Sequence, residues 1–250
     1  MLTEQRYQLI LELLEQRKSI TVTEVKDLLD TSESTVRRDI TALHKAGKLT
    51  KVFGGAIALE QKHKVTANEP TVAQKIDVNK EEKKRIAAYA AGLIEEDDFV
   101  YLDAGTTTGY MLDYLKDTKA AFVTNAVSHA QQLAGNGIKV QLVGGELKAS
   151  TEAVIGNMAM RMLKGFHFTK GFFGTNGIAE KEGYTTPDTN EAMIKRAAME
   201  QCRECYMLAD SEKFGNVSSV TFSEFEEAEV LTDVCPEEYA GFENITVVKQ

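Results

Sequence analysis

The chain has 250 residues, a formal net charge of −9 and 43% apolar residues. This length suits two domains or one large α/β domain, and the apolar content is sufficient for a hydrophobic core. No run approaches the ~18 apolar residues of a membrane helix, and charges interrupt the first apolar run, so we expect neither a membrane protein nor a signal peptide. Three cysteines give no disulfide framework, which favours a reducing cytoplasm.

The negative charge is unevenly distributed along the chain. Residues 1–60 contain nine basic and nine acidic residues, whereas residues 61–85 contain seven basic and four acidic ones. Residues 86–250 carry a net charge of −12. A polyanionic partner is therefore compatible with the N-terminal part, and the acidic C-terminal part should face away from it.

Three helices are predicted in the first 50 residues. Apolar residues at helical spacing predict the first helix over 2–16, and Thr23 is a candidate N-cap for the second. The third helix is predicted between Ser32, whose hydroxyl can cap it, and Gly47, a candidate C-cap. Its single apolar stripe consists of Val36, Ile40 and Leu43.

Two short apolar segments, 49–52 and 56–59, flank Gly54-Gly55 and predict a β-hairpin. Three helices followed by such a hairpin form a winged helix-turn-helix of about 60 residues, whose third helix enters a DNA major groove. An ordinary amphipathic surface helix is the alternative. The side chains expected to contact DNA carry hydroxyl or basic groups. They are Thr23, Ser34, Thr35, Arg37, Arg38, Lys45, Lys48 and Lys51. We expect Asp39 to hold the two neighbouring arginines rather than to touch DNA, because phosphate repels a carboxylate.

The polar stretch 61–80 predicts a linker, and a helix is predicted over 81–94. We expect the Lys83-Lys84-Arg85 run of this helix to be a solvated face rather than a phosphate contact. From residue 99 onward, buried strands alternate with helices, which predicts a mainly parallel sheet covered on both faces. The strands are predicted at 99–102, 121–124, 140–143, 171–173, 206–209, 229–232 and 245–248, and the helices at 109–115, 127–134, 153–163 and 190–202.

Several of these strands end in small or polar residues. The first is followed by the loop 103–109, Asp-Ala-Gly-Thr-Thr-Thr-Gly, in which a Gly turn and hydroxyls precede a helix. Such a loop can cradle a phosphate, although the Gly-Lys pair of a Walker loop is missing and no G-x-G-x-x-G follows a strand. Nucleotide cofactors are therefore not expected. Because ligands bind at the carboxyl ends of parallel strands, we expect one polar crevice suited to a phosphorylated sugar; the alternative is that these are ordinary turn residues.

The chain resembles the DeoR family of bacterial transcription regulators. The resemblance lies in Ser32-Glu33-Ser34-Thr35-Val36-Arg37-Arg38-Asp39-Ile40 and in the wing Lys51-Val52-Phe53-Gly54-Gly55-Ala56, and further along in D-x-G-T-T, T-N, G-G and D-x-x-K-F-G in that order. Lys51 and Phe53 replace the family's usual Arg and His, and Glu212 replaces a small hydroxyl residue. The segment 184–188 is closer to fructose-operon repressors than to glycerol or lactose ones.

The resemblance implies a DNA-binding domain over 1–60, a linker over 61–80 and a sensor domain over 81–250 similar to the ribose-5-phosphate isomerase and CoA-transferase fold. It also implies a repressor that binds double-stranded operator DNA as a homodimer or homotetramer under the control of a sugar phosphate. The expected effector contacts are Asp103, Gly105, Thr106, Thr107, Thr108, Thr124, Asn125, Gly145, Thr175, Asn176, Glu191, Lys195 and Lys213. Glu191 and Lys195 could instead simply pair with each other across one helical turn.

Two other kinds of site are less favoured. A sugar-phosphate isomerase needs a carboxylate base, and the loop 174–177 offers only Thr and Asn, although Glu180 and Glu182 follow it. A zinc site would need ligands beyond Cys202 and Cys205, with only Cys235 and scattered histidines remaining. We therefore expect neither an enzyme nor a metalloprotein.

Overall fold

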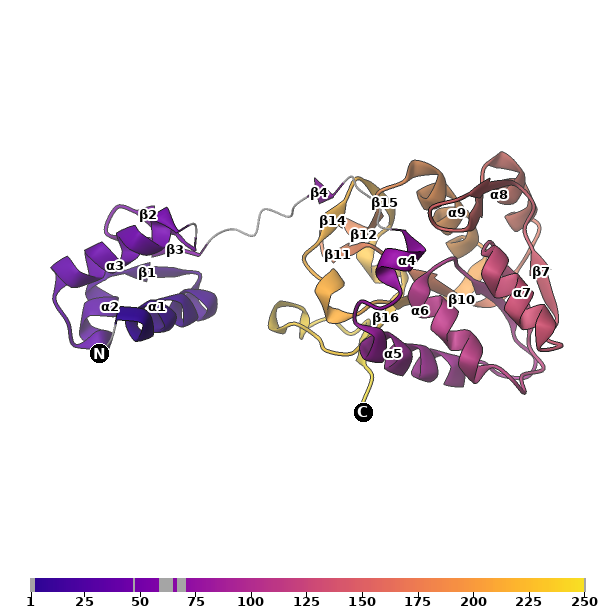
Figure 1. Cartoon of the computed structure of the whole chain (residues 1–250), viewed down its shortest axis with the longest axis horizontal. Coiled ribbons are helices and arrows are strands. Elements are labelled where there is room, and N and C mark those ends of the chain that lie inside the picture. The colour runs from indigo at the N-terminus through magenta and orange to yellow at the C-terminus, as the bar shows by residue number, and fades with distance from the viewer. Residues whose placement is uncertain (1–2, 47, 59–64, 67–70, 250) are drawn as a thin grey trace. The chain divides into compact units, whose positions relative to one another are not determined.

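The computed structural model describes residues 3–46, 48–58, 65–66 and 71–249, and the chain divides into two compact units, residues 1–62 and 63–250 (Figure 1). Within these described ranges, no helix is long and apolar enough to cross a membrane.

The first unit consists of three helices and a three-stranded antiparallel sheet. Its elements are α1 (Thr3–Arg17), β1 (Ser19–Thr21), α2 (Val22–Leu29), α3 (Glu33–Lys45), β2 (Thr50–Val52) and β3 (Gly55–Ile57). The sheet has the order β1-β3-β2, and both pairings are antiparallel. The predicted stripe Val36, Ile40 and Leu43 is buried in the common core of the three helices. This arrangement confirms the predicted winged helix-turn-helix.

The caps of two helices differ from the prediction. Thr21, and not Thr23, is the N-cap of α2, because its side chain and that of Glu24 form a reciprocal capping box. Ser32 caps α3 as predicted, its hydroxyl accepting the Thr35 backbone N–H at 3.2 Å. The helix has Ala46 as its C-cap, while the predicted cap Gly47 lies outside the described residues.

The second unit is built on a seven-stranded sheet with the order β17-β16-β13-β10-β5-β6-β7. Every neighbouring pair in it is parallel, which confirms the predicted sheet. Its strands are β5 (Phe99–Leu102), β6 (Ala121–Thr124), β7 (Val140–Leu142), β10 (Phe168–Gly174), β13 (Cys202–Leu208), β16 (Glu229–Thr232) and β17 (Ile245–Val247).

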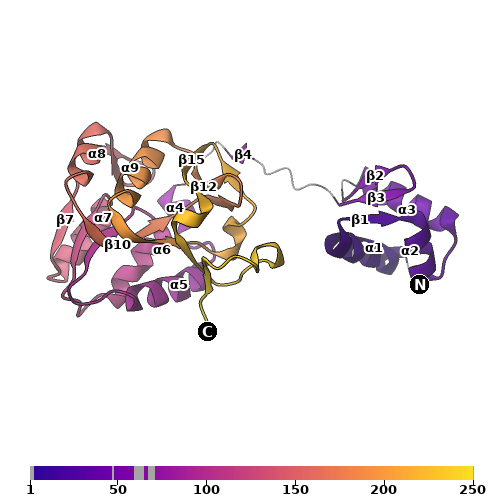
Figure 2. The same ribbon diagram turned by 180° about the vertical axis from the view of Figure 1, so that it is seen from behind.

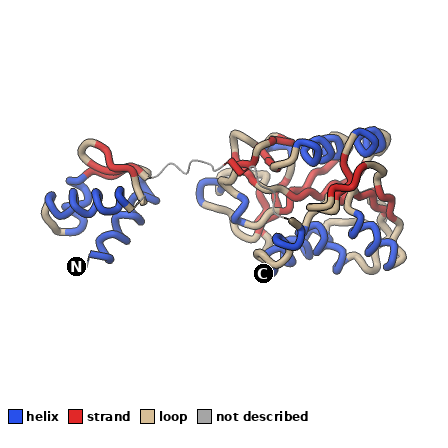
Figure 3. The backbone as a smooth tube through the Cα atoms, turned by 45° about the horizontal axis from the view of Figure 1, so that its top comes forward, coloured by secondary structure: helices blue, strands red, loops and turns tan. Residues whose placement is uncertain are grey.

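Helices cover both faces of this sheet (Figures 1 and 3). One face packs against α5 (Lys80–Gly92), α6 (Thr106–Met111) and α7 (Val127–Gly135), and the other against α8 (Asn157–Leu163) and α9 (Thr189–Met199). Alternation along β5 explains the two cores: Tyr101 joins the α8–α9 side, whereas Val100 and Leu102 join the α5–α7 side. The sheet is therefore buried on both faces.

Smaller strands complete the unit (Figure 2). They are β4 (Val65–Thr66), β8 (Glu146–Lys148), β9 (Ala153–Ile155), β11 (Gly177–Ala179), β12 (Gly183–Thr186), β14 (Val217–Ser218) and β15 (Val220–Ser223). The predicted helix over 153–163 is wrong in its first part, because 153–155 form β9 in a hairpin with β8. Gly156 then turns the chain into α8 at φ 95°, a conformation that favours glycine. The helix predicted over 190–202 ends at Met199, and Cys202 already belongs to β13.

The stretch predicted as a linker, 61–80, contains secondary structure. Its described residues include β4, which pairs in parallel with β14, and the short helix α4 (Val72–Lys75). Thr71 and Gln74 form a capping box at the start of α4. Part of the stretch, 61–64 and 67–70, lies outside the described residues. Polar composition alone suggested a linker here, but a capping box stabilises even a single helical turn.

Candidate functional site

In the first unit, the N-terminal end of α3 presents hydroxyls and cations to solvent. Ser34, Arg37 and Arg38 are exposed, and the Ser32 hydroxyl lies 2.8 Å from that of Ser34. The Arg37 guanidinium forms an ion pair with Glu33 one turn earlier, at 3.2 Å. An exposed pair of this kind is worth well under about 1 kcal/mol, so it leaves Arg37 able to turn to another anion.

The first strand of the wing, β2, extends this polar surface. The Lys51 ammonium donates to the Thr41 hydroxyl on α3 at 2.9 Å, which fixes the wing lysine beside the helix. Lys45 and Lys48 are exposed, as is Thr23 in the first turn of α2. At the turn of the hairpin, the Phe53 side chain is fully exposed. All eight sequence-predicted DNA contacts therefore belong to one unit. Thr35 is half-buried among them, and its hydroxyl lies 2.9 Å from that of the N-cap Ser32.

Asp39 has a different role from the one expected. Its buried carboxylate accepts two hydrogen bonds from the Arg6 guanidinium of α1, at 2.7 and 3.1 Å, instead of holding the arginines of its own helix. Position 39 faces inward with Val36 and Ile40, whereas positions 37 and 38 face outward, so the pairing follows from helix geometry. Asp39 thus ties α3 to α1.

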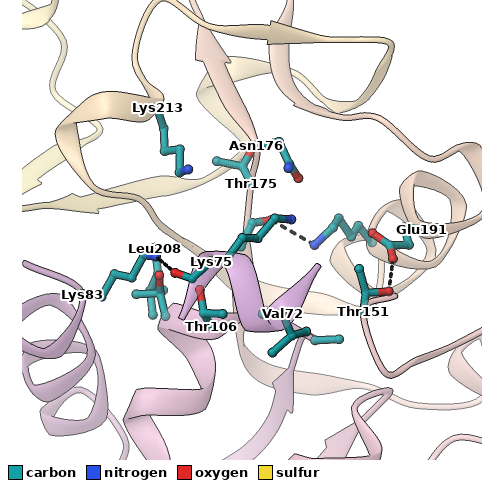
Figure 4. Close-up of a pocket in the computed structure, with 15 residues that line it drawn as sticks. Val72, Lys75, Lys83, Thr106, Thr151, Thr175, Asn176, Glu191, Leu208 and Lys213 are labelled. Atoms are coloured by element: carbon teal, nitrogen blue, oxygen red, sulfur yellow. Dashed lines mark hydrogen bonds between the residues drawn. The ribbon is translucent and has the colours of Figure 1, made fainter. Parts of the chain in front are cut away.

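In the second unit, a cavity of about 70 Å³ lies where β5 and β10 end (Figure 4). Eight of the predicted effector residues line it: Gly105, Thr106, Thr107, Thr175, Asn176, Glu191, Lys195 and Lys213. Residues that the sequence reasoning did not assign to the site also line it: Val72, Lys75, Lys83, Ala104, Thr151, Gly174 and Leu208.

Lysine ammonium groups dominate the charge of this cavity. Four lysines line it, namely Lys75, Lys83, Lys195 and Lys213. Lys83 is only 3% exposed and donates to the backbone carbonyl of Lys75 at 2.7 Å. Burial lowers the pKa of the Lys83 ammonium, and the charges of Lys213 and Lys75 lower it further, against the opposing effect of Asp210. The prediction of a solvated face is therefore wrong for Lys83.

Asp103 supports the site from behind the cavity. It is 1% exposed and pairs with the Lys195 ammonium, which also donates to the Gly174 carbonyl at 2.9 Å. The Gly174 N–H in turn donates to Asp103 at 3.1 Å. Burial raises the pKa of the Asp103 carboxyl, while the Lys195 charge opposes that rise. Three elements, β5, β10 and α9, are thereby joined at one point.

Glu191 belongs to a second polar cluster at the Thr151 end of the cavity. The Thr151 hydroxyl donates to the Glu191 carboxylate, as Figure 4 shows, and the Lys148 ammonium lies 3.2 Å from it. The same lysine pairs with Asp188 at 3.0 Å. The ion pairs found for Glu191 and Lys195 thus involve Lys148 and Asp103, and not the pairing across one helical turn that was the alternative.

Five predicted effector residues lie outside the cavity lining. Besides Asp103, they are Thr108, Thr124, Asn125 and Gly145, which shape the backbone or its packing. The Thr108 hydroxyl donates to the Asp103 carbonyl at 2.8 Å, and Thr124 accepts the Ala126 N–H at 3.0 Å. The Asn125 side chain accepts the Ala104 N–H at 2.9 Å, which shapes the loop that lines the cavity. A Cβ at Gly145 would come within 2.5 Å of the Ile155 carbonyl, so this glycine permits close packing.

One of the missed residues carried a usable sequence signal. Lys83 lies three residues before Ile86 and seven before Ala90, which places it on the buried face of α5. Lys75 had no comparable signal, because α4 is a single turn without an apolar stripe. The carboxylates weighed for an isomerase, Glu180 and Glu182, are not among the cavity-lining residues that the structure describes. Among the residues that the structure describes, no cluster of metal-binding side chains is found.

An exposed winged helix-turn-helix surface joined in one chain to a separate α/β unit is the architecture of a DNA-binding regulator. Comparison with known families agrees, because residues 6–62 match the DeoR-like helix-turn-helix domain and residues 78–234 match the DeoR C-terminal sensor domain. The chain belongs to the DeoR family of transcriptional regulators, which confirms the resemblance seen in the sequence.

Similar proteins carry regulator names over their full length. The uncharacterised HTH-type transcriptional regulator FruR of Bacillus subtilis (strain 168) is 39% identical, covering 100% of this chain and 98% of its own. A lactose phosphotransferase system repressor of Streptococcus mutans is 33% identical, over 94% and 93% of the two chains. The transcriptional repressor GlcR of Bacillus subtilis is 32% identical, over 94% and 90%. These relatives are regulators, as expected here, rather than enzymes.

Among solved structures, ribose 5-phosphate isomerase A of Methanocaldococcus jannaschii aligns with a TM-score of 0.42 and 12% identity. The alignment covers 54% of this chain and 55% of the isomerase.

Proposed function

We propose that this regulator is a repressor of a sugar-utilisation operon and that a phosphorylated sugar, bound in the cavity of the second unit, controls its affinity for operator DNA. The observation that carries the proposal is the convergence of four lysine ammonium groups with the hydroxyls of the Thr106–Thr107 loop in one cavity. Ammonium groups are common partners of phosphate, and hydroxyl and amide groups suit sugar oxygens. The names of the lactose and GlcR relatives support control of sugar metabolism.

The eight DNA-binding residues named above are proposed to contact the operator, with α3 in the major groove. One chain presents one such helix, so we propose that at least two chains bind repeated half-sites together. The effector must bind the DNA-bound and free forms unequally, because equal affinity would leave the equilibrium unchanged. The likeness of the segment 184–188 to fructose-operon repressors makes a fructose phosphate the first effector to test.

Thermal-shift screening tests the effector. We expect the melting temperature to rise with one of fructose 1-phosphate, fructose 6-phosphate, tagatose 6-phosphate or glycerol 3-phosphate, but not with the unphosphorylated sugars. Lys213→Gln should weaken the binding of that ligand by about tenfold or more, because a hydrogen bond to a charged group contributes about 1.5–3 kcal/mol. Lys181→Gln is the matched control, because Lys181 is exposed and does not line the cavity. Equal effects of the two substitutions would contradict the placement of the phosphate.

A further inference from the structure

One wall of the cavity is formed by a short segment around the single-turn helix α4. We call Thr71–Ile76, which contains α4 and its caps, the strap. It contributes Val72 and Lys75 to the cavity lining. Hydrogen bonds hold it to the rest of the second unit. Among them, the Val72 N–H donates to the Ser150 carbonyl at 3.2 Å, the Tyr110 hydroxyl to the Ile76 carbonyl at 2.7 Å, and the Lys83 ammonium to the Lys75 carbonyl at 2.7 Å.

The cavity is too small for a sugar phosphate as it stands. Its volume of about 70 Å³ compares with the roughly 300 Å³ or more of typical small-molecule sites. A ligand therefore has to displace part of the lining. Most of the other walls are the ends of buried strands or come from α9, where Glu191 and Lys195 are buried and hydrogen-bonded.

The strap is the wall that can move at the lowest cost. The helix within it is a single turn and has no buried residue, so shifting it exposes little apolar surface. The strap groups in the three hydrogen bonds named above are two backbone carbonyls and one backbone N–H, which water can satisfy once the strap lifts. Opening the cavity at the strap leaves the seven-stranded sheet intact.

The lysine charges around the cavity would draw the displaced strap back onto an anion once the ligand has entered. Lys75 on the strap, Lys83 on α5 and Lys213 beyond β13 all line the cavity, and Figure 4 labels the three side chains around it. Like charges repel at this range, and the effects of Lys75 and Lys213 on Lys83 point in that direction. A phosphate dianion among them would replace repulsion by attraction.

We propose that the strap is a lid that a bound phosphate fastens through Lys75, so that Lys75 and Lys83 are ligand-contacting residues of the sensor site. This inference rests on the proposed function, since it assumes that the cavity binds a phosphorylated ligand. In the sequence, the strap lies between the first unit, which ends at residue 62, and α5. Fastening it restrains the chain segment through which the sensor unit is joined to the DNA-binding unit.

Hydrogen exchange of the full-length protein tests the lid, with inorganic phosphate as the probe and sodium chloride at matched ionic strength as the reference. We expect phosphate to slow amide exchange severalfold in two peptides, one covering 71–83 and one covering the loop 103–109. In Lys75→Gln, the slowing at 71–83 should be lost while that at 103–109 remains. Lys84→Gln, a neighbouring lysine that does not line the cavity, should behave as the wild type.

A second variant tests the lid without touching the ligand-binding charges. Tyr110→Phe removes the hydrogen bond to the Ile76 carbonyl, so exchange at 71–76 should be faster without phosphate and slow again when phosphate is added. Slowing at 103–109 but not at 71–83 in the wild-type protein would overturn the lid and leave the proposed effector site standing. No slowing in either peptide would contradict both the lid and the proposed effector site. Unaltered slowing in Lys75→Gln would show that Lys75 does not contact the ligand.

Discussion

Asp103 shows how burial determines what a polar residue can do. The sequence places this carboxylate at the end of a strand, where it could contact a ligand directly. The structure places it behind the cavity, 1% exposed and paired with Lys195. A buried charge needs such a partner, because removing one member of a buried pair typically costs about 3–5 kcal/mol. Asp103 is therefore better described as the residue that positions Lys195.

His129 on α7 is a second buried polar residue, and it predicts a pH dependence of stability. It is 6% exposed, its Nδ1 has no hydrogen-bond partner among the described residues, and burial lowers its pKa from 6.5 to about 4. As the pH falls below 6.5, the unfolded chain takes up a proton before the folded chain does. The free energy of unfolding should therefore be unaffected above pH 6.5 and fall by up to about 3 kcal/mol toward pH 4.

Comparing variants isolates this contribution from that of the carboxylates. Chemical denaturation at a series of pH values should show a shallower loss of stability in His129→Gln than in the wild type below pH 6.5. His167→Gln is the control, because His167 is exposed. Identical pH profiles for the wild type and His129→Gln would show that the imidazole is not held neutral in the folded protein.

At the scale of elements, α3 carries the prediction for DNA binding. Its inward face is fixed by the apolar stripe and by the Asp39–Arg6 ion pair, which leaves Arg37 and Arg38 on the outward face. Arg37→Ala should weaken operator binding by about 1–3 kcal/mol in a fluorescence anisotropy titration. The melting temperature should change little, because the Glu33–Arg37 pair is exposed.

Arg161→Ala in α8 removes the same charge from an exposed site of the other unit and is the matched control. It should leave operator affinity unchanged. Equal losses of affinity in the two variants would mean that net charge, and not the position of Arg37 on α3, governs the binding.

The elements that the sequence predicted well are those with a strong local signal. The strands 99–102, 121–124 and 229–232 have the predicted bounds because a fully buried parallel strand is a short continuous apolar run. Residues 153–155 form a similar run, but the prediction merged it with the following helix. Nothing in the sequence indicated that Gly156 adopts a positive φ and ends the strand there. The strap was missed because a four-residue helix has no periodicity to detect.

Local sequence signals also explain which residues of the cavity could be predicted. Its loop 105–107 and Lys213 could be predicted, because strand ends of a parallel sheet converge on one edge. Lys75, Thr151 and Leu208 could not, since their place in the cavity depends on segments that come together only through tertiary packing. Thr108 and Asn125 were predicted as contacts but shape the backbone, because a hydroxyl or amide near a turn satisfies the chain first.

At the scale of the whole molecule, the two units differ in net charge as well as in proposed function. The N-terminal 60 residues are neutral overall with a basic surface on α3 and the wing, and residues 86–250 carry the excess acid. An acidic sensor unit disfavours nonspecific attachment to DNA and leaves recognition to the first unit. In the proposed function, a phosphorylated sugar in the cavity changes how tightly the first unit binds its operator.

Titration of a labelled duplex from the protein's own promoter region, at low salt and with a scrambled duplex as reference, tests this control of DNA binding. We expect preferential binding of the promoter duplex and a change in its Kd of about fivefold or more when the stabilising sugar phosphate is added. This change should be lost in Lys213→Gln, while binding without the sugar phosphate is retained. Failure to bind the duplex, or a Kd that no sugar phosphate alters, would contradict it.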